Sequence, residues 1–243
     1  MRAARAEEIR YIHDRQIYRY STREECVQKT GWPPVGLKWI DTNKGGRTRA
    51  EMKLRSRLVC TEVRRKGTEG HFATAPPLET LRVLGTKLAS EDPTGVADPL
   101  KATLVDVSRA HFYADSVREV FVKLPAEDPR LSDPGACGRL VKTMYGTLDA
   151  AERWAAHYTA TLEKAGFNVG SASPCHFHHP ELDVWVLVHG DDFLIVGRGA
   201  GRKHAVDTLK AEYTIKEETV GPQDGDQKQM KVLGRILTVH SWG

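Results

Sequence analysis

Two adjacent aspartates, Asp191 and Asp192, are the residues in this chain whose types and position best suit chemistry. They stand between two short apolar runs, 184–188 and 193–196, and glycines at 190 and 197 bound these runs. Such a pattern predicts two strands joined by a tight turn, with both carboxylates at its tip. Adjacent carboxylates repel each other, and a bound cation offsets that repulsion. A divalent metal site is therefore one interpretation, and a solvated Gly-Asp-Asp turn is the other.

A third carboxylate, Asp106, favours the metal site. It follows the strand-like run 102–105 and lies 85 residues before Asp191, which leaves room for a helical segment between two neighbouring strands. Three aspartates on adjacent strands suit a two-metal site. In such a site, hard cations take carboxylate oxygens and hold the attacking and leaving oxygens of a phosphoryl transfer. Considered alone, Asp106 would be a structural strand end.

A series of short motifs occurs along the chain in an order typical of one family. They are LV at 58–59 after a basic pair, LVDVSRA at 104–110, VFVKLP at 120–125, MYG at 144–146, RW at 153–154, SPCHF at 173–177 and VHGDD at 188–192. In this order and at these spacings the chain resembles the reverse transcriptase core of copia-type retrotransposon polyproteins, from about residue 37 to residue 234.

The resemblance implies a right-hand polymerase palm with part of the fingers. It also implies that the three aspartates are catalytic and that two Mg²⁺ or Mn²⁺ ions are held by Asp106, Val107, Asp191 and Asp192. The chain stops soon after residue 234, so we expect a truncated thumb and an excised or truncated portion of a longer polyprotein.

A basic strand is the candidate contact for the incoming nucleotide. Residues 55–59 alternate in character, which places Arg55 and Arg57 on the same face of a strand. Two guanidinium groups on one face can hold a triphosphate through bidentate hydrogen bonds. The resemblance implies this role for both, with Arg57 the closer match, and extends the nucleotide-binding set to Ser108, Arg109, Ala110 and His111. In the family pattern an aromatic residue shields the sugar of the nucleotide where this chain has His111.

The charge is divided unevenly along the chain. Residues 1–72 hold 17 basic and 9 acidic residues, a net charge of +8, while the remainder has a net charge of −4. A basic front section followed by an acidic section is typical of a metal-using enzyme that binds a polyanion. Over residues 2–23 interleaved acids favour a solvated helix instead. Residues 53–59 and 64–66 contain basic but no acidic side chains, which favours contact with nucleic acid.

The remaining patterns predict an α+β domain with an antiparallel sheet and helices on one face of it. We expect helices over 3–20, around residues 81–88, from 149 to about 166 and over 203–213, and a final strand over 231–239. We predict an N-terminal helical extension over residues 1–34 and a fingers and palm core over residues 35–240.

Other site types fit poorly. Cys175 lies beside three histidines, but this nearly contiguous run lacks the second ligand pair of a zinc site. Four widely spaced cysteines form no Cys-x-x-Cys pair and predict reduced thiols. No apolar stretch approaches the roughly 20 residues of a membrane span, and the N-terminus lacks the apolar core of a signal peptide. We therefore expect a cytoplasmic or nuclear protein without a membrane partner.

Together these features predict an RNA-directed DNA polymerase that extends a primer 3′-hydroxyl. Its partners would be an RNA or DNA template with its primer, deoxynucleoside triphosphates and other parts of the polyprotein. The alternative is a folded but inactive nucleic-acid-binding remnant, since His111 departs from the family pattern and the chain is short.

Overall fold

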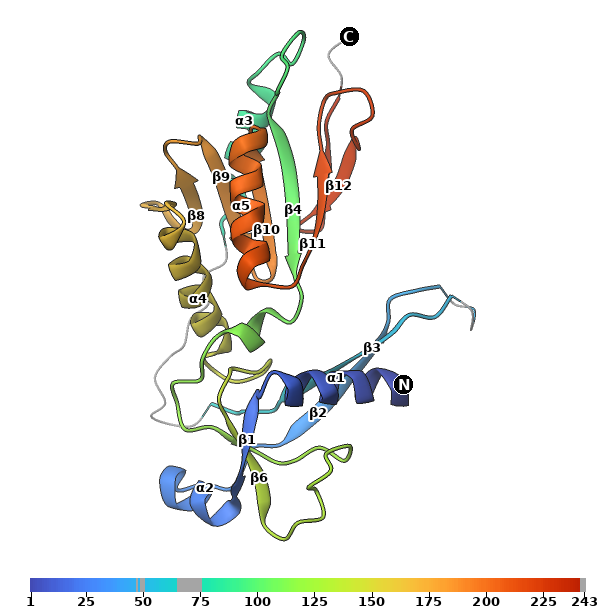
Figure 1. The fold of residues 1–243 in the computed structure, drawn as a ribbon, viewed down its shortest axis with the longest axis vertical. Coiled ribbons are helices and arrows are strands. Elements are labelled where there is room, and N and C mark those ends of the chain that lie inside the picture. Colours follow the sequence, from blue (N-terminus) through green and yellow to red (C-terminus); the bar gives the residue numbers. More distant parts are fainter. Residues whose placement is uncertain (47, 49–50, 65–75, 241–243) are drawn as a thin grey trace. The chain divides into compact units, whose positions relative to one another are not determined.

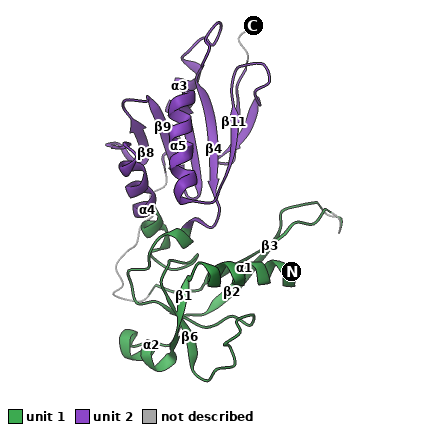
Figure 2. Cartoon of the chain, in the orientation of Figure 1, with its two compact units in different colours: residues 1–72, 111–154 green, residues 73–110, 155–243 purple. Residues whose placement is uncertain are grey.

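The structure is a computed structural model that describes residues 1–46, 48, 51–64 and 76–240. The chain forms two compact units, which Figure 2 distinguishes by colour. Unit 1 contains residues 1–72 and 111–154, and unit 2 contains residues 73–110 and 155–243. Residues 1–34 belong to unit 1.

Unit 2 is built on a six-stranded antiparallel sheet whose order is β11-β4-β10-β9-β8-β7 (Figure 1). The predicted acidic hairpin is confirmed as β9 and β10, and the strand that carries Asp106 pairs with β10 as expected. The strands are β4 (Lys101–Val107), β7 (Asn168–Gly170), β8 (Ser173–His179), β9 (Val184–His189), β10 (Asp192–Gly197) and β11 (Ile215–Val220).

Helices cover both faces of this sheet. The helix α3 (Leu78–Ala89) places Leu84 in a core cluster with Leu194 of β10. The helix α4 (Ala150–Lys164) places Tyr158 with its ring centroid 5.6 Å from that of Phe193. Since Phe193 and Leu194 are consecutive in a strand, their side chains point to opposite faces. The prediction of helices on one face is therefore wrong. The cause is β10 itself, which is buried from Phe193 to Gly197 and needs cover on both sides.

Two further elements complete unit 2. The helix α5 (Gly199–Glu212) packs on the face that carries Phe193, where a Cβ atom at Gly201 would lie 2.8 Å from Cβ of Val184. The C-terminal segment is a hairpin of β12 (Gln229–Val232) and β13 (Arg235–Thr238), so the single strand predicted over 231–239 is wrong. The chain turns there because Leu233 and Gly234 have φ angles of +48° and +75°.

Unit 1 contains two small antiparallel sheets, β2-β3 and β1-β6-β5. The helix α1 buries Ile9 and Ile12 in a core cluster with Leu58 of β3. The elements are α1 (Arg2–Asp14), β1 (Tyr18–Thr22), α2 (Arg23–Thr30), β2 (Leu37–Asn43), β3 (Leu54–Cys60), the 3-10 turn η1 (Ala110–Tyr113), β5 (Phe121–Val122) and β6 (Ala136–Leu140).

The helix predicted over 3–20 ends at Asp14. Gln16 adopts a left-handed conformation, with φ of +50°, and residues 18–22 then pair with β6 as a strand. The N-terminal region is thus part of the sheet structure of unit 1 and is only partly helical. Among the residues that the structure describes, no helix is both long and apolar enough to cross a membrane.

Candidate active site

The three predicted catalytic aspartates lie together at one end of the two central strands of unit 2. Asp192 begins β10 and is the direct cross-strand partner of Asp106 on β4. Asp191 is held in the turn, where its carbonyl oxygen accepts a 2.9 Å hydrogen bond from the N–H of Val107. Gly190 allows the turn to be this tight, since its φ angle is +64°. The local sequence Gly-Asp-Asp thus brings two carboxylates against a third.

The pKa of Asp192 reflects the electrostatics of this cluster. Burial, followed by the negative charges of Asp191 and Asp106, raises the pKa of this half-buried carboxyl group from 3.8 to about 6. His189, its cross-strand partner on β9, acts in the opposite direction. Asp106 itself is exposed. The charges of Asp191 and Asp106 therefore oppose ionisation of Asp192.

The donor chemistry of the cluster fits hard divalent cations, which prefer carboxylate oxygens. Within the described residues, no group of three or more His, Cys, Asp and Glu side chains is already arranged around a common ion position. The fit therefore rests on the type of ligand and on the crowding of like charge that raises the pKa of Asp192.

Asp192 should make the stability of the metal-free chain depend on pH. Its pKa is about 6 in the folded chain, against an ordinary value of 3.8. The folded state therefore holds this proton more tightly. The resulting stabilisation is present below pH 4 and is lost as the pH rises through 6. With a chelator present, we expect the parent to lose about 1–2 kcal/mol relative to Asp192→Asn between pH 4 and 7, after allowance for solvent screening of a half-exposed group.

The measurement is chemical denaturation of both chains across that pH range. Asp183→Asn is the control, because interactions with Lys87 and His178 lower the pKa of Asp183 and give the opposite slope. Parallel pH profiles for the parent and Asp192→Asn would contradict the assignment of this group.

Two residues near the cluster were not singled out for the site by the sequence. Lys216 on β11 is the cross-strand partner of Asp106, so it lies on the same face of the sheet. The sequence of β11 gave no indication that this strand would pair with β4. For His189 the sequence left open contact with the primer end or simple filling of space, and the structure places it opposite Asp192. Both residues set the charge around the aspartates.

The segment after Asp106 leaves the sheet through the residues predicted to contact nucleotide. Ser108 donates its N–H to the carbonyl oxygen of Thr214 at 2.9 Å. Arg109 follows with a left-handed φ of +56°, and Ala110 is only 2% exposed. The strand therefore turns sharply just beyond its aspartate.

The predicted nucleotide contacts of unit 1 also lie partly together. Ser56, Leu58 and Cys60 of β3 are buried, so Arg55 and Arg57 share the opposite face, as the sequence predicted. The guanidinium carbon of Arg57 lies 5.0 Å from the ring centroid of Tyr145. The ring of His111 lies 4.6 Å from the same tyrosine, edge-on at 85°.

The basic run at 64–66 also was predicted to face nucleic acid. Arg65 and Lys66 lie outside the described residues, so the structure gives no position for this part of the prediction. Cys175 and Phe177 are buried on β8, the strand that precedes the acidic hairpin. The neighbouring His178 stacks on Trp185, with 3.8 Å between ring centroids, and its Nε2 atom lies 3.3 Å from Asp183.

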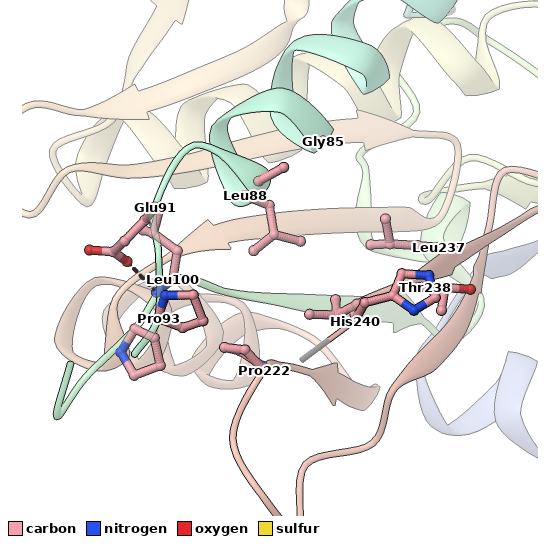
Figure 3. Close-up of a pocket in the computed structure, with 12 residues that line it drawn as sticks. Gly85, Leu88, Glu91, Pro93, Leu100, Pro222, Leu237, Thr238 and His240 are labelled. Carbon is pink, nitrogen blue, oxygen red and sulfur yellow. Dashed lines mark hydrogen bonds between the residues drawn. The ribbon is translucent and has the colours of Figure 1, made fainter. Parts of the chain in front are cut away.

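One pocket of unit 2 lies away from the aspartates. Figure 3 shows this pocket of about 410 Å³, with Leu88 of α3 on one side and Leu237 of β13 on the other. Leu100, another lining residue, comes just before β4 begins, whereas Asp106 lies near the end of that strand. The pocket and the carboxylates thus lie at opposite ends of β4, and the pocket contributes nothing to the candidate active site.

Comparison with known proteins agrees with this geometry. The family model described as reverse transcriptase (RNA-dependent DNA polymerase) matches residues 26–221, which is most of the chain. The chain belongs to this family. Its match to retrotransposon relatives confirms the predicted resemblance to copia-type reverse transcriptases.

Two of these relatives come from Saccharomyces cerevisiae. The Transposon Ty1-MR1 Gag-Pol polyprotein is 27% identical over 134 residues, which cover 54% of this chain and 7% of the relative. The truncated transposon Ty1-A Gag-Pol polyprotein is 27% identical over the same share of this chain and 11% of its own length. The chain therefore matches about a tenth or less of the length of these polyproteins.

The fold is similar to that of a telomerase from Candida albicans. The TM-score is 0.50 and the sequence identity is 10%, with 95% of this chain and 48% of that chain covered. At this identity the similarity concerns the fold alone.

Proposed function

We propose that this chain is the nucleotidyl-transfer core of an RNA-directed DNA polymerase. In this proposal the sheet of unit 2 is the palm, and β2 with β3 forms part of the fingers. The observation that carries it is the pairing of Asp192 with Asp106 beside Asp191, which crowds three carboxylates at a hairpin tip. The family match over residues 26–221 supports the same chemistry.

Asp106, Asp191 and Asp192 would hold two Mg²⁺ or Mn²⁺ ions, with Val107 beside them. When bound, such ions lower the pKa of the primer 3′-hydroxyl and neutralise charge on the triphosphate. The residues of the chain supply the rest. Asp106 and Asp191 present charged oxygens at the end of the sheet, while Asp192 anchors the hairpin beside them. Lys216, on the same face as Asp106, limits the total negative charge.

The family resemblance implies nucleotide contacts within each of the two units. Arg55 and Arg57 would bind the triphosphate through their guanidinium groups. Ser108, Arg109 and Ala110 would line the approach to the aspartates, and His111 would meet the sugar. A primed RNA or DNA template, deoxynucleoside triphosphates and other parts of a polyprotein are the proposed partners.

The decisive test is primer extension by the purified chain. The assay contains a DNA primer on an RNA template, the four deoxynucleoside triphosphates, and Mg²⁺ or Mn²⁺. Extension in proportion to enzyme concentration supports the proposal. Template binding without extension would instead support the inactive nucleic-acid-binding remnant, because binding needs the basic strands but not the aspartates.

Binding to template and primer should weaken steeply with salt. Lys38, Arg55 and Arg57 lie on one face of the β2-β3 sheet, because Lys38 pairs with Val59, two residues beyond Arg57. Three phosphate contacts predict a loss of about 40-fold in affinity between 50 and 200 mM salt, at about 0.9 released counterions per contact. Fluorescence anisotropy with a labelled duplex measures this slope.

Arg55→Ala should lower the salt slope by about one. Lys203→Ala is the matched control, because Lys203 is an exposed cation in unit 2 that pairs with Asp207. A flat salt response of the parent would indicate that the basic face is only a solvated surface.

A further inference from the structure

We propose that Tyr145 is the positioning residue of the nucleotide site, because its ring fixes Arg57 and His111 relative to each other. The inference rests on the proposed function and deepens it. Neither the family pattern quoted above nor the sequence reasoning gave Tyr145 a role. The structure assigns it one through contacts to two segments that are far apart in the sequence, β3 and the 3-10 turn η1.

The backbone of Tyr145 is locked against β3. The N–H of Cys60 donates to the carbonyl oxygen of Tyr145 at 2.7 Å. The next residue, Gly146, has a φ angle of +86°, and a Cβ atom there would lie 2.0 Å from the carbonyl oxygen of Cys60. Only glycine permits such an approach. The backbone of Tyr145 is therefore held beside β3, the strand that carries Arg57, and this fixes the position of its ring.

The ring then contacts both candidate nucleotide-binding side chains. The guanidinium carbon of Arg57 lies over it at 5.0 Å from the centroid, within the range of a cation–π interaction. His111 meets it edge-on at 4.6 Å, and Phe112 approaches at 5.8 Å with an interplanar angle of 70°. One aromatic ring therefore restrains a long, flexible cation and an imidazole at the same time.

His111 is restrained from a second side. Its Nδ1 atom lies 3.2 Å from the carbonyl oxygen of Ala150, and its own carbonyl oxygen accepts a hydrogen bond of 2.5 Å from Oγ1 of Thr143. A carbonyl oxygen only accepts, so Nδ1 carries the proton in this contact. In the neutral imidazole this leaves Nε2 as an acceptor, which suits a sugar hydroxyl.

Recognition of the triphosphate and recognition of the sugar are therefore coupled through Tyr145. Without the ring, Arg57 gains rotamers that must be frozen again on binding, and His111 loses the surface that sets its angle. Cation–π interactions of about 0.5–2 kcal/mol correspond to an affinity change of about 2- to 30-fold. The loss should appear in nucleotide affinity and in sugar selectivity, whereas the maximal rate should change little.

The test compares Tyr145→Phe with Tyr145→Leu. Binding of dATP and of ATP is measured with a template and a primer that ends in a dideoxynucleotide, so that no chemistry occurs. We expect Tyr145→Leu to bind dATP about 10-fold more weakly and to change the dATP/ATP ratio. Tyr145→Phe should stay within about twofold of the parent on both measures, because it keeps the ring.

Tyr20→Leu is the matched control. Tyr20 lies in the same unit, and the guanidinium carbon of Arg130 lies 4.5 Å from its ring centroid. This variant removes the same type of contact away from Arg57, so nucleotide binding should be unchanged. A loss equal to that of Tyr145→Leu would show a general effect on unit 1 and would overturn the proposal.

Arg57→Ala separates this inference from the proposed function. If Arg57→Ala weakens dATP binding and Tyr145→Leu does not, the positioning role is wrong while the nucleotide site stands. If neither variant changes binding, the nucleotide site in unit 1 fails, and the positioning role fails with it. If both do, the double variant should lose less affinity than the sum of the two single losses, because part of the effect of the tyrosine acts through the arginine.

An NMR measurement on the parent chain tests the contact between Tyr145 and Arg57 even if a variant does not fold. In the parent chain, the Tyr145 ring should shift the NMR signals of the Arg57 side-chain protons upfield, and Tyr145→Phe should retain the shift. Ordinary solvent-exposed arginine shifts in the parent would overturn the proposal without any variant.

Discussion

Asp106→Asn and Asp191→Asn should each reduce the rate of primer extension by about 10³-fold or more, which corresponds to about 4 kcal/mol of transition-state stabilisation. Asparagine keeps the size of the side chain but removes the charge that a hard cation requires. The structure places both residues at the same end of the β4-β10 pair, so neither can replace the other. The measurement is a single-turnover extension rate at saturating nucleotide and Mg²⁺.

The double variant should lose little more than either single variant. Residues that act as a unit show strongly non-additive effects, since the first substitution already disables the site. Asp183→Asn is the control, because Asp183 is an exposed carboxylate of unit 2 that pairs with Lys87. Extension rates equal to that control in both single variants would contradict the assignment of the site.

Metal binding gives a readout that does not depend on activity. Mn²⁺ or Mg²⁺ at about 100 times its dissociation constant should stabilise the parent by about 2.7 kcal/mol. The stabilisation by metal should be smaller in Asp191→Asn. This variant loses one carboxylate ligand, and the two that remain repel each other less, so a bound cation relieves less repulsion. Equal stabilisation of the parent and this variant would place the metal elsewhere.

The acidic hairpin could be predicted from the sequence because every signal for it is local. Apolar runs, flanking glycines and the Asp-Asp pair all lie within residues 184–197. Its pairing with the strand of Asp106 is non-local, but the hypothesis of one metal site shared by three carboxylates suggested that the two strands are neighbours, and they pair. The register, with Asp192 opposite Asp106, was not predicted and comes from the structure.

The arrangement of the helices was missed although its signal was present. Phe193 to Val196 is a continuous apolar run and does not alternate, which is typical of a strand that is buried on both faces. A sheet with helices on one face would show alternation. Leu84 and Tyr158 now account for the run, since they pack on its opposite faces.

The N-terminal helix was extended too far for a different reason. Ile9 and Ile12 follow helical spacing, whereas Tyr18 to Thr22 forms a strand because it pairs with β6, more than 110 residues later in the chain. A strand whose partner is this distant in sequence leaves little local evidence. The contacts of Tyr145 were not predicted for the same reason. Arg57 and His111, which contact its ring, lie in segments that are distant from it in the sequence.

Gly146→Ala should destabilise unit 1 by about 3 kcal/mol. A methyl group at this position would lie 2.0 Å from the carbonyl oxygen of Cys60 and 2.8 Å from Cγ1 of Val59, so the backbone must move. Overpacking of this kind costs about 1–3 kcal/mol, and the left-handed conformation costs an L-residue a further 1–2 kcal/mol. Chemical denaturation measures the total.

Gly31→Ala is the matched control for this substitution. Gly31 lies in the same unit with φ of +74°, but nothing lies within 4 Å of a Cβ atom there. Only the conformational cost of about 1 kcal/mol applies, so the difference between the two variants isolates the close approach of residue 146 to β3. Hydrogen exchange locates the effect, because the N–H of Cys60 bonds to Tyr145 and should lose protection in Gly146→Ala alone. Equal destabilisation of the two variants would mean that the Tyr145–Gly146 segment does not lie against β3, and the restraint on Arg57 would then have no fixed anchor.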